Sequence, residues 1–229
     1  MPPQPLGKVK SGANYLMIGG FAERPEVANG IARCLANWSW VETMTSYIFL
    51  KLLGTNHKAA IALYNSFESA KGKTDAIRTL AISKLPAQEL DLVKAALRLV
   101  KSHQSARDRI AHWLWGLSED LPDAMVMLDP KLLLAKEAHL RENWLSGKGV
   151  AVSDFKHDEM DIYVYTAAAL KKDAEDFASL ARLIAQVGFF LDPHHKRPER
   201  DVLFAELTQD ARLAQFLSPS SSAGRMQPF

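Results

Sequence analysis

The chain has 229 residues, 48% hydrophobic and 24% charged, with a net charge of +2 and a pI of about 8.6. This is the composition of an ordinary globular protein, and so small a net charge does not by itself indicate a nucleic-acid binder. No apolar run is long enough to span a membrane. The single cysteine, Cys34, excludes an intramolecular disulfide and fits a reducing compartment. We therefore expect a cytoplasmic protein with one sizeable core and no membrane association.

The first half of the chain is predicted to be helical. Prolines and glycines make residues 1–23 a loosely ordered N-terminal arm. The spacing of apolar residues and of capping residues then predicts four helices, at residues 25–54, 56–69, 75–85 and 86–113. Gly72 is expected to break the chain before the third helix, and Thr74 to cap it. Since each helix needs the others to bury its apolar face, we predict an antiparallel helical bundle.

The pattern changes after Gly116. β-Branched and aromatic residues predict strands at residues 124–128, 150–152 and 162–166, which would form a small antiparallel β insertion at about 124–166. Residues 131–141 fit either a strand or a helix. Helical spacing returns at 167–191 and 199–217, and the serine-rich tail 218–229 is predicted to be disordered. The fold class is therefore mainly α, with one helical domain over residues 24–217.

The residues with the clearest chemistry lie at the end of the fourth predicted helix, in the segment Ala-Arg-Asp-Arg-Ile-Ala-His-Trp at 106–113. An arginine fork can hold a phosphate, and a histidine can move a proton near neutral pH. We predict Arg107, Asp108 and His112 as catalytic residues. Asp108 would orient His112, because residues four apart share a helix face.

The surroundings of this segment are basic. Residues 71–109 contain nine Lys or Arg and four Asp or Glu, a local net charge of +5. This could be a side that faces phosphates, with Lys101 and Arg109 binding substrate, or simply a solvated helical face.

Each predicted helix has a stripe of apolar residues along one face, and two positions in these stripes are polar. The stripe of the fourth helix continues to Arg107, and the stripe of the first helix contains Glu42. These two could form a buried ion pair, with Arg109 as the other candidate partner, or Glu42 could lie at the edge of its stripe and reach water. Arg107 and His112 are five residues apart, about 140° around a regular helix. They can converge if the helix loosens, if the arginine side chain curls over, or if a second subunit completes the site.

The segment Arg107-Asp108-x-x-x-His112 resembles the Arg-polar-x-x-x-His motif of the HEPN family (higher eukaryotes and prokaryotes nucleotide-binding domains). The resemblance covers residues 25–117. It implies an all-helical core, a homodimer in which both motifs line one cleft, and a metal-independent endoribonuclease. It is compatible with a role in stress response or phage defence and with an antitoxin-like protein partner.

In such an enzyme His112 would act as general base or acid, and Arg107 would neutralise charge on the phosphoryl oxygens. RNA cleavage would leave a 2′,3′-cyclic phosphate, and DNA, which lacks the 2′-hydroxyl, would survive. No cofactor or metal is expected, since the sequence has none of the usual zinc or di-iron spacings. The alternative is a noncatalytic dimeric interaction module in which the same segment is structural. A second Arg-x4-His spacing, Arg98 to His103, has Leu99 in place of the polar residue.

Overall fold

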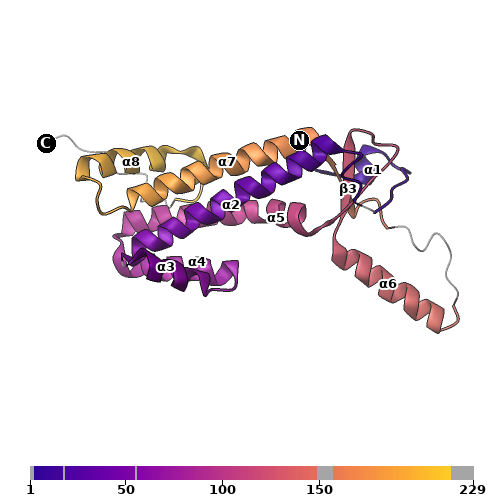
Figure 1. Ribbon diagram of the computed structural model, residues 1–229, viewed down its shortest axis with the longest axis horizontal. Helices are drawn as coiled ribbons and strands as arrows, with labels where there is room; N and C mark the ends of the chain where they lie inside the picture. Colours follow the sequence, from indigo (N-terminus) through magenta and orange to yellow (C-terminus); the bar gives the residue numbers. More distant parts are fainter. Residues whose placement is uncertain (1–2, 18, 55, 149–156, 218–229) are drawn as a thin grey trace. The chain divides into compact units, whose positions relative to one another are not determined.

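The computed structural model describes residues 3–17, 19–54, 56–148 and 157–217. It is mainly helical, with 68% helix, nine helices and a four-stranded antiparallel sheet among these residues (Figure 1). The predicted fold class is confirmed at this level. The strand predicted at 150–152 and the tail 218–229 lie outside the described residues. No helix in the described ranges combines the length and the apolar character needed to cross a membrane.

The chain divides into two compact units, residues 1–36 with 106–176, and residues 37–105 with 177–229. Three long helices contribute to both units. They are α2 (Pro25–Leu53), α5 (Ala87–His112) and α7 (Ala167–Phe190), which agree closely with the helices predicted at 25–54, 86–113 and 167–191.

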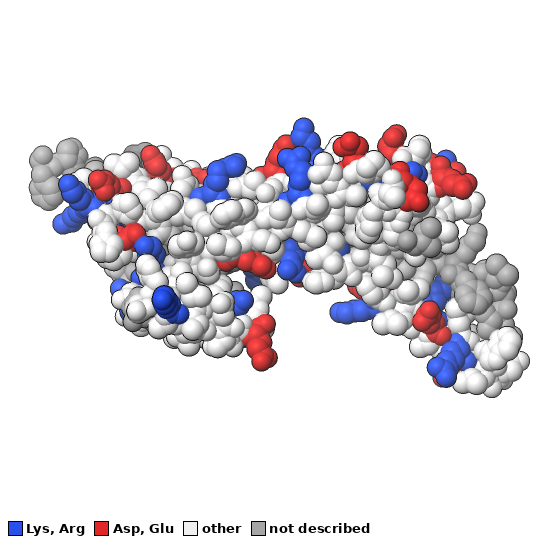
Figure 2. Space-filling view, in the orientation of Figure 1, with Lys and Arg blue, Asp and Glu red and all other residues white. Residues whose placement is uncertain are grey.

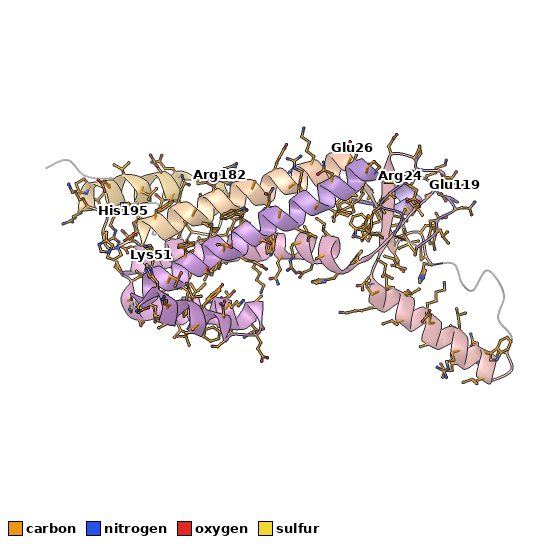
Figure 3. The ribbon with its side chains drawn as sticks, viewed as in Figure 1. Arg24, Glu26, Lys51, Glu119, Arg182 and His195 are labelled. Carbon is orange, nitrogen blue, oxygen red and sulfur yellow. The ribbon has the colours of Figure 1, made fainter. Side chains whose placement is uncertain are left out.

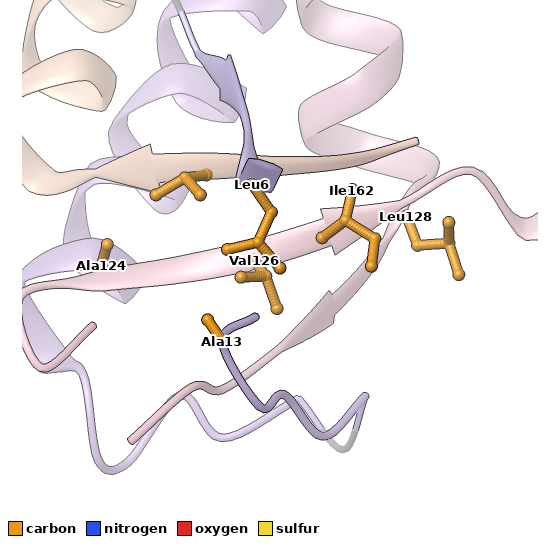
Figure 4. Packing of buried hydrophobic residues seen from close by; sticks show 7 residues of the cluster. Leu6, Ala13, Ala124, Val126, Leu128 and Ile162 are labelled. Carbon is orange, nitrogen blue, oxygen red and sulfur yellow. The ribbon is translucent and has the colours of Figure 1, made fainter. Parts of the chain in front are cut away.

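The first unit is built on the sheet. Its strands are β1 (Gln4–Pro5), β2 (Leu114–Gly116), β3 (Ala124–Leu128) and β4 (Ile162–Thr166), in the order β1-β4-β3-β2. Met127 on β3 is opposite both Trp115 on β2 and Tyr163 on β4. Because side chains alternate along a strand, one face carries Val126, Leu128, Ile162 and Val164, which pack with Leu6 and Ala13 (Figure 4). The other face carries Trp115, Met125, Met127, Tyr163 and Tyr165.

The N-terminal segment is not the loose arm that its prolines and glycines predicted. It contributes β1 and the short helix α1 (Leu6–Val9), and Leu6 is completely buried. Lys10 forms an ion pair with Asp120, and the backbone N–H of Gly12 donates to Glu159. The burial of one leucine under the sheet therefore orders a segment that its local sequence does not order.

The ambiguous segment at 131–141 is helical, within α6 (Pro130–Leu145). Asp129 caps this helix by accepting from the backbone N–H of Lys131 at 2.9 Å, and Pro130 occupies its first turn. An Asp-Pro pair favours such a start, because proline fixes φ and lacks the N–H that would be unpaired there. Leu133 packs against the sheet, and Leu140 is buried.

The second unit contains α3 (His57–Asn65) and α4 (Ala70–Lys84). Asn56 caps α3 as predicted, accepting from Lys58, and Tyr64 on α3 packs on Phe49 of α2. The helix predicted at 75–85 starts earlier, at residue 70. Ser69 caps it by accepting from the N–H of Gly72, so Gly72 lies in the first turn and does not break the chain. Thr74 is inside the helix, where it bonds the carbonyl of Ala70.

The last predicted helix, 199–217, is two helices, α8 (Arg197–Gln209) and α9 (Ala211–Ala214). Asp210 separates them because its carboxylate accepts from the N–H of Arg212 and caps α9. Arg200 on α8 pairs with Glu89 on α5.

At the end of α2, Lys51 pairs with Asp192, close to the loop that carries His195 (Figure 3). This contact lowers the pKa of Asp192.

Candidate functional site

The Arg-Asp-Arg segment occupies the last two turns of α5, directly before β2. The helix remains regular to its end, since the N–H of Trp113 still donates to the carbonyl of Arg109 at 3.0 Å. Arg109 and His112 lie in the last turn, where positive charge complements the helix dipole. The segment therefore sits at a junction where a helix ends and the sheet of the first unit begins.

Arg107 and His112 contact each other within one chain. The Nη1 atom of Arg107 lies 3.1 Å from Nε2 of His112 and 3.1 Å from Oδ1 of Asp108. Since the backbone does not loosen here, the long arginine side chain spans the angle between the two positions. This is one of the three routes to convergence that the spacing left open, and it needs no second subunit.

The partners in this group differ from the prediction in one respect. Asp108 was expected to orient His112, but its carboxylate accepts from Arg107. The arginine is thus the central group, and it contacts the carboxylate on one side and the imidazole on the other. The side chain of Arg107 is 26% exposed and that of Asp108 45% exposed, and His112 is also exposed. The group is therefore accessible to solvent.

The Arg107 contact selects one form of His112. A guanidinium has only donors, so Nε2 of the imidazole must accept. A hydrogen bond at this contact therefore requires the tautomer with its proton on Nδ1. In this arrangement the lone pair of Nε2 is directed at the same N–H that a phosphate oxygen would bind.

Arg109 acts on the interior of the first unit and not on this group. Burial raises the pKa of Tyr165 on β4 and of Asp173 on α7, and in both cases the nearby guanidinium of Arg109 opposes the rise. Tyr165 is completely buried. The geometry gives Arg109 neighbours on β4 and α7, which the prediction that it binds substrate did not include.

Cys34 belongs to the same interior. Its thiol donates to the carbonyl of Leu170 at 3.3 Å, and burial raises its pKa to about 12. Since the thiolate is the reactive form, Cys34 is an inert core residue.

Lys101 and Glu42 belong to the second unit. Lys101 is exposed, and its charge contributes to the lowered pKa of Asp75 on α4 after the larger effect of Lys71. Glu42 is exposed and accepts from the indole N–H of Trp38 at 2.8 Å. This agrees with the alternative in which Glu42 lies at the edge of its stripe. An ion pair with Arg107 or Arg109 would join the two units and stays a prediction.

The second Arg-x4-His spacing, hereafter the upstream pair, has different contacts. Arg98 donates to the carbonyl of Phe216 at 3.3 Å. Nδ1 of His103 lies 3.0 Å from the carbonyl of Leu99, and its ring packs edge-on against Phe177. The same spacing thus gives no arginine–histidine contact here. We call Arg107 and His112 the terminal pair.

The sequence did not indicate that the two tryptophans after the terminal pair would pack on two tyrosines of β4. Trp113 packs against Tyr163, and Trp115 against Tyr165, each with ring centroids 5.7 Å apart. The sequence carries one signal of this packing, because Trp113 and Trp115 are two residues apart and so are Tyr163 and Tyr165. Residues two apart lie on the same face of an extended segment.

Basic and acidic side chains are interspersed over the face seen in Figure 2. Among the described residues, no group of three or more His, Cys, Asp or Glu side chains could hold a metal ion.

Comparison with known proteins gives no match to any family model, curated protein or solved structure.

Proposed function

We propose that the chain is a HEPN-like RNA-binding protein and a metal-independent endoribonuclease, with Arg107 and His112 as its catalytic residues. The single observation that carries this proposal is the 3.1 Å contact between Nη1 of Arg107 and Nε2 of His112 on an accessible surface. A phosphate-binding cation and a proton-transfer group within one contact distance are the minimum that RNA cleavage without a metal requires.

The proposed reaction begins when an RNA phosphate binds Arg107. A non-bridging oxygen of the phosphate replaces Nε2 of His112 as the acceptor of the hydrogen bond from Nη1. The lone pair of Nε2 is then free. The imidazole then removes the proton of the adjacent ribose 2′-hydroxyl. The 2′-oxygen attacks phosphorus, and the bond from phosphorus to the 5′-oxygen breaks.

The products follow from the balance of this step. The bond formed is 2′-O–P, so one fragment ends in a 2′,3′-cyclic phosphate. The leaving 5′-oxygen takes a proton from water or from a second copy of the site, and the other fragment ends in a 5′-hydroxyl. Asp108 keeps the guanidinium of Arg107 in place while the other acceptor of Arg107 changes from His112 to the phosphate.

The HEPN resemblance adds a homodimer to this proposal, in which two copies of the segment line one cleft. The second imidazole would then act as the acid when the first acts as the base. A role in stress response or defence, and an antitoxin-like protein that covers the cleft, belong to the same proposal.

The alternative is a noncatalytic interaction module. The observation that favours it is the position of the basic residues in the last turn of α5, where they stabilise the helix end without any reaction. In that case the arginine and histidine would contribute to stability and not to turnover.

One experiment decides between the two. The protein is incubated with end-labelled RNA and excess EDTA, beside His112→Ala and the matched control His103→Ala from the upstream pair. We expect cleavage by the wild type and by His103→Ala but not by His112→Ala, with 2′,3′-cyclic phosphate ends and no cut at a 2′-deoxy position. No cleavage by the wild type, or full cleavage by His112→Ala, would reject the nuclease proposal.

A further inference from the structure

The residue after the terminal pair, Trp113, packs against Tyr163 on β4. The rings of Trp113 and Tyr163 have centroids 5.7 Å apart and an angle of 63° between their planes, and both residues are only partly buried. Trp113 follows His112 directly, so their Cα atoms are about 3.8 Å apart. Trp113 therefore directly follows the catalytic imidazole in the chain.

A second aromatic pair, between Trp115 on β2 and Tyr165 on β4, is buried. Trp115 and Tyr165 have the same centroid distance and the same angle, but Trp115 is 8% exposed and Tyr165 is completely buried. The indole N–H of Trp115 also donates to the carbonyl of Ile110, which ties β2 to α5. The inner pair thus supplies the core packing at this junction.

The strand pairing keeps the outer pair in place. Tyr163 is opposite Met127 on β3 and Pro5 on β1, so its backbone is held on both sides. Trp113 lies between the last residue of α5 and the first of β2. A ring fixed in this way loses little conformational freedom when a ligand packs on it, which favours binding.

We infer that Trp113 and Tyr163 form a stacking platform for an unpaired base beside the scissile phosphate, and that the substrate class is single-stranded RNA. This inference rests on the proposed function, because it places the base relative to His112. A base in a duplex has both faces covered by its neighbours, whereas a base in a single strand can stack on an aromatic side chain. Stacking of this kind does not depend on base identity, so the platform selects strandedness and not sequence.

The test measures binding without cleavage. A fluorescein-labelled 2′-O-methyl RNA of mixed sequence cannot be cut, because its 2′-hydroxyl is blocked. We expect Trp113→Leu to raise its Kd about tenfold, the typical effect of one lost stacking contact. Trp113→Phe, which keeps a ring, should stay within about threefold. The matched control is Trp144→Leu on α6, where the side chain is 72% exposed, and it should bind like the wild type.

Two further measurements keep the test decisive if Trp113→Leu folds poorly. With the wild-type protein, an abasic strand of the same length should bind about tenfold more weakly than the full strand, since only its bases are missing. The duplex form of the same sequence should also bind more weakly than the single strand. Equal binding of the abasic and full strands, or of the single strand and the duplex, would overturn the platform.

The outcome is separable from that of the proposed function. If the wild type cleaves RNA but Trp113→Leu binds the 2′-O-methyl strand as well as the wild type does, the platform is wrong and the nuclease stands. If the wild type cleaves nothing but binds the strand in a Trp113-dependent way, the nuclease is wrong and the base-binding surface stands.

Discussion

Helix α5 carries the same spacing of arginine and histidine twice, and only one copy brings the two side chains together. In the terminal pair, Arg107 and His112 are 3.1 Å apart, whereas in the upstream pair Arg98 reaches Phe216 and His103 bonds the carbonyl of Leu99. A spacing of five residues puts the side chains about 140° apart in both cases. The difference must therefore come from the other contacts that each side chain makes.

Those contacts can be identified. His103 is in the middle of the helix, where the carbonyl one turn earlier and the ring of Phe177 occupy it. His112 is the last residue of the helix and is exposed. In addition, Arg107 is followed by Asp108, which accepts from its Nη1 atom, whereas Arg98 is followed by the buried Leu99. A sequence motif of this kind thus depends on the helix end and on the neighbouring carboxylate as much as on its spacing.

The largest expected effect comes from removing each histidine in turn. Loss of a general acid–base group typically costs about 10²–10⁴-fold in rate. We expect this loss in kcat/KM for His112→Ala and less than about a twofold change for His103→Ala. The measurement is the initial rate on a labelled single-stranded RNA. Equal losses in the two variants would mean that the contact in the terminal pair has no special role.

The next effect comes from the arginines. Arg107→Ala should lower kcat/KM by about 10²–10³-fold, because one donor to the developing oxyanion is lost. Arg107→Lys should recover only part of this loss, since a lysine lacks the fork that contacts Asp108 and a phosphate together. Arg98→Ala is the control and should retain the wild-type rate. Full activity of Arg107→Lys would show that charge alone is sufficient.

A smaller effect is expected when the terminal segment is made to resemble the upstream one. Asp108→Leu reproduces the Arg-Leu sequence of residues 98 and 99. An exposed ion pair contributes about 0.2–1 kcal/mol, so we expect kcat/KM to fall by no more than about fivefold. A fall as large as that of Arg107→Ala would instead make Asp108 a participant in the reaction.

The smallest effect concerns the interior behind the terminal pair. Burial raises the pKa of Asp173 above its ordinary value, so the folded state binds its proton more tightly than the unfolded state does. Between those two pKa values, stability should decrease as pH rises, and above them the ionised carboxylate costs stability. Asp173→Asn should therefore be modestly more stable than the wild type at neutral pH, with the gain shrinking in acid. Urea unfolding at several pH values measures this, and a gain that persists unchanged in acid would contradict it.

The sequence predicted the long helices well, whereas the site stays a prediction. Apolar spacing located α2, α5 and α7 almost to the residue, because long amphipathic helices carry many repeats of the same signal. It failed at α1 and β1, where Leu6 is buried against residues of β3 and β4 that lie far along the chain. It also failed at Gly72, which lies in the first turn of α4, where its N–H donates to the capping hydroxyl of Ser69.

At the candidate site, the residue types and their order led to the prediction of Arg107, Asp108 and His112. They did not indicate that Asp108 contacts Arg107. Nor did they indicate that the charge of Arg109 opposes the raised pKa values of Tyr165 and Asp173, because tertiary packing brings these residues of β4 and α7 near it. The sequence states which groups are available, and tertiary packing determines how they pair.

The most direct test of the central claim is the tautomer of His112, because the claim depends on one arginine hydrogen shared with one imidazole nitrogen. Long-range ¹H–¹⁵N NMR of the ¹⁵N-histidine-labelled protein, at a pH where the ring is neutral, reports which nitrogen carries the proton. We predict the proton of His112 on Nδ1 in the wild type and a shift towards Nε2 in Arg107→Ala. A wild-type ring that carries its proton on Nε2, with the same spectrum in Arg107→Ala, would show that the contact does not form.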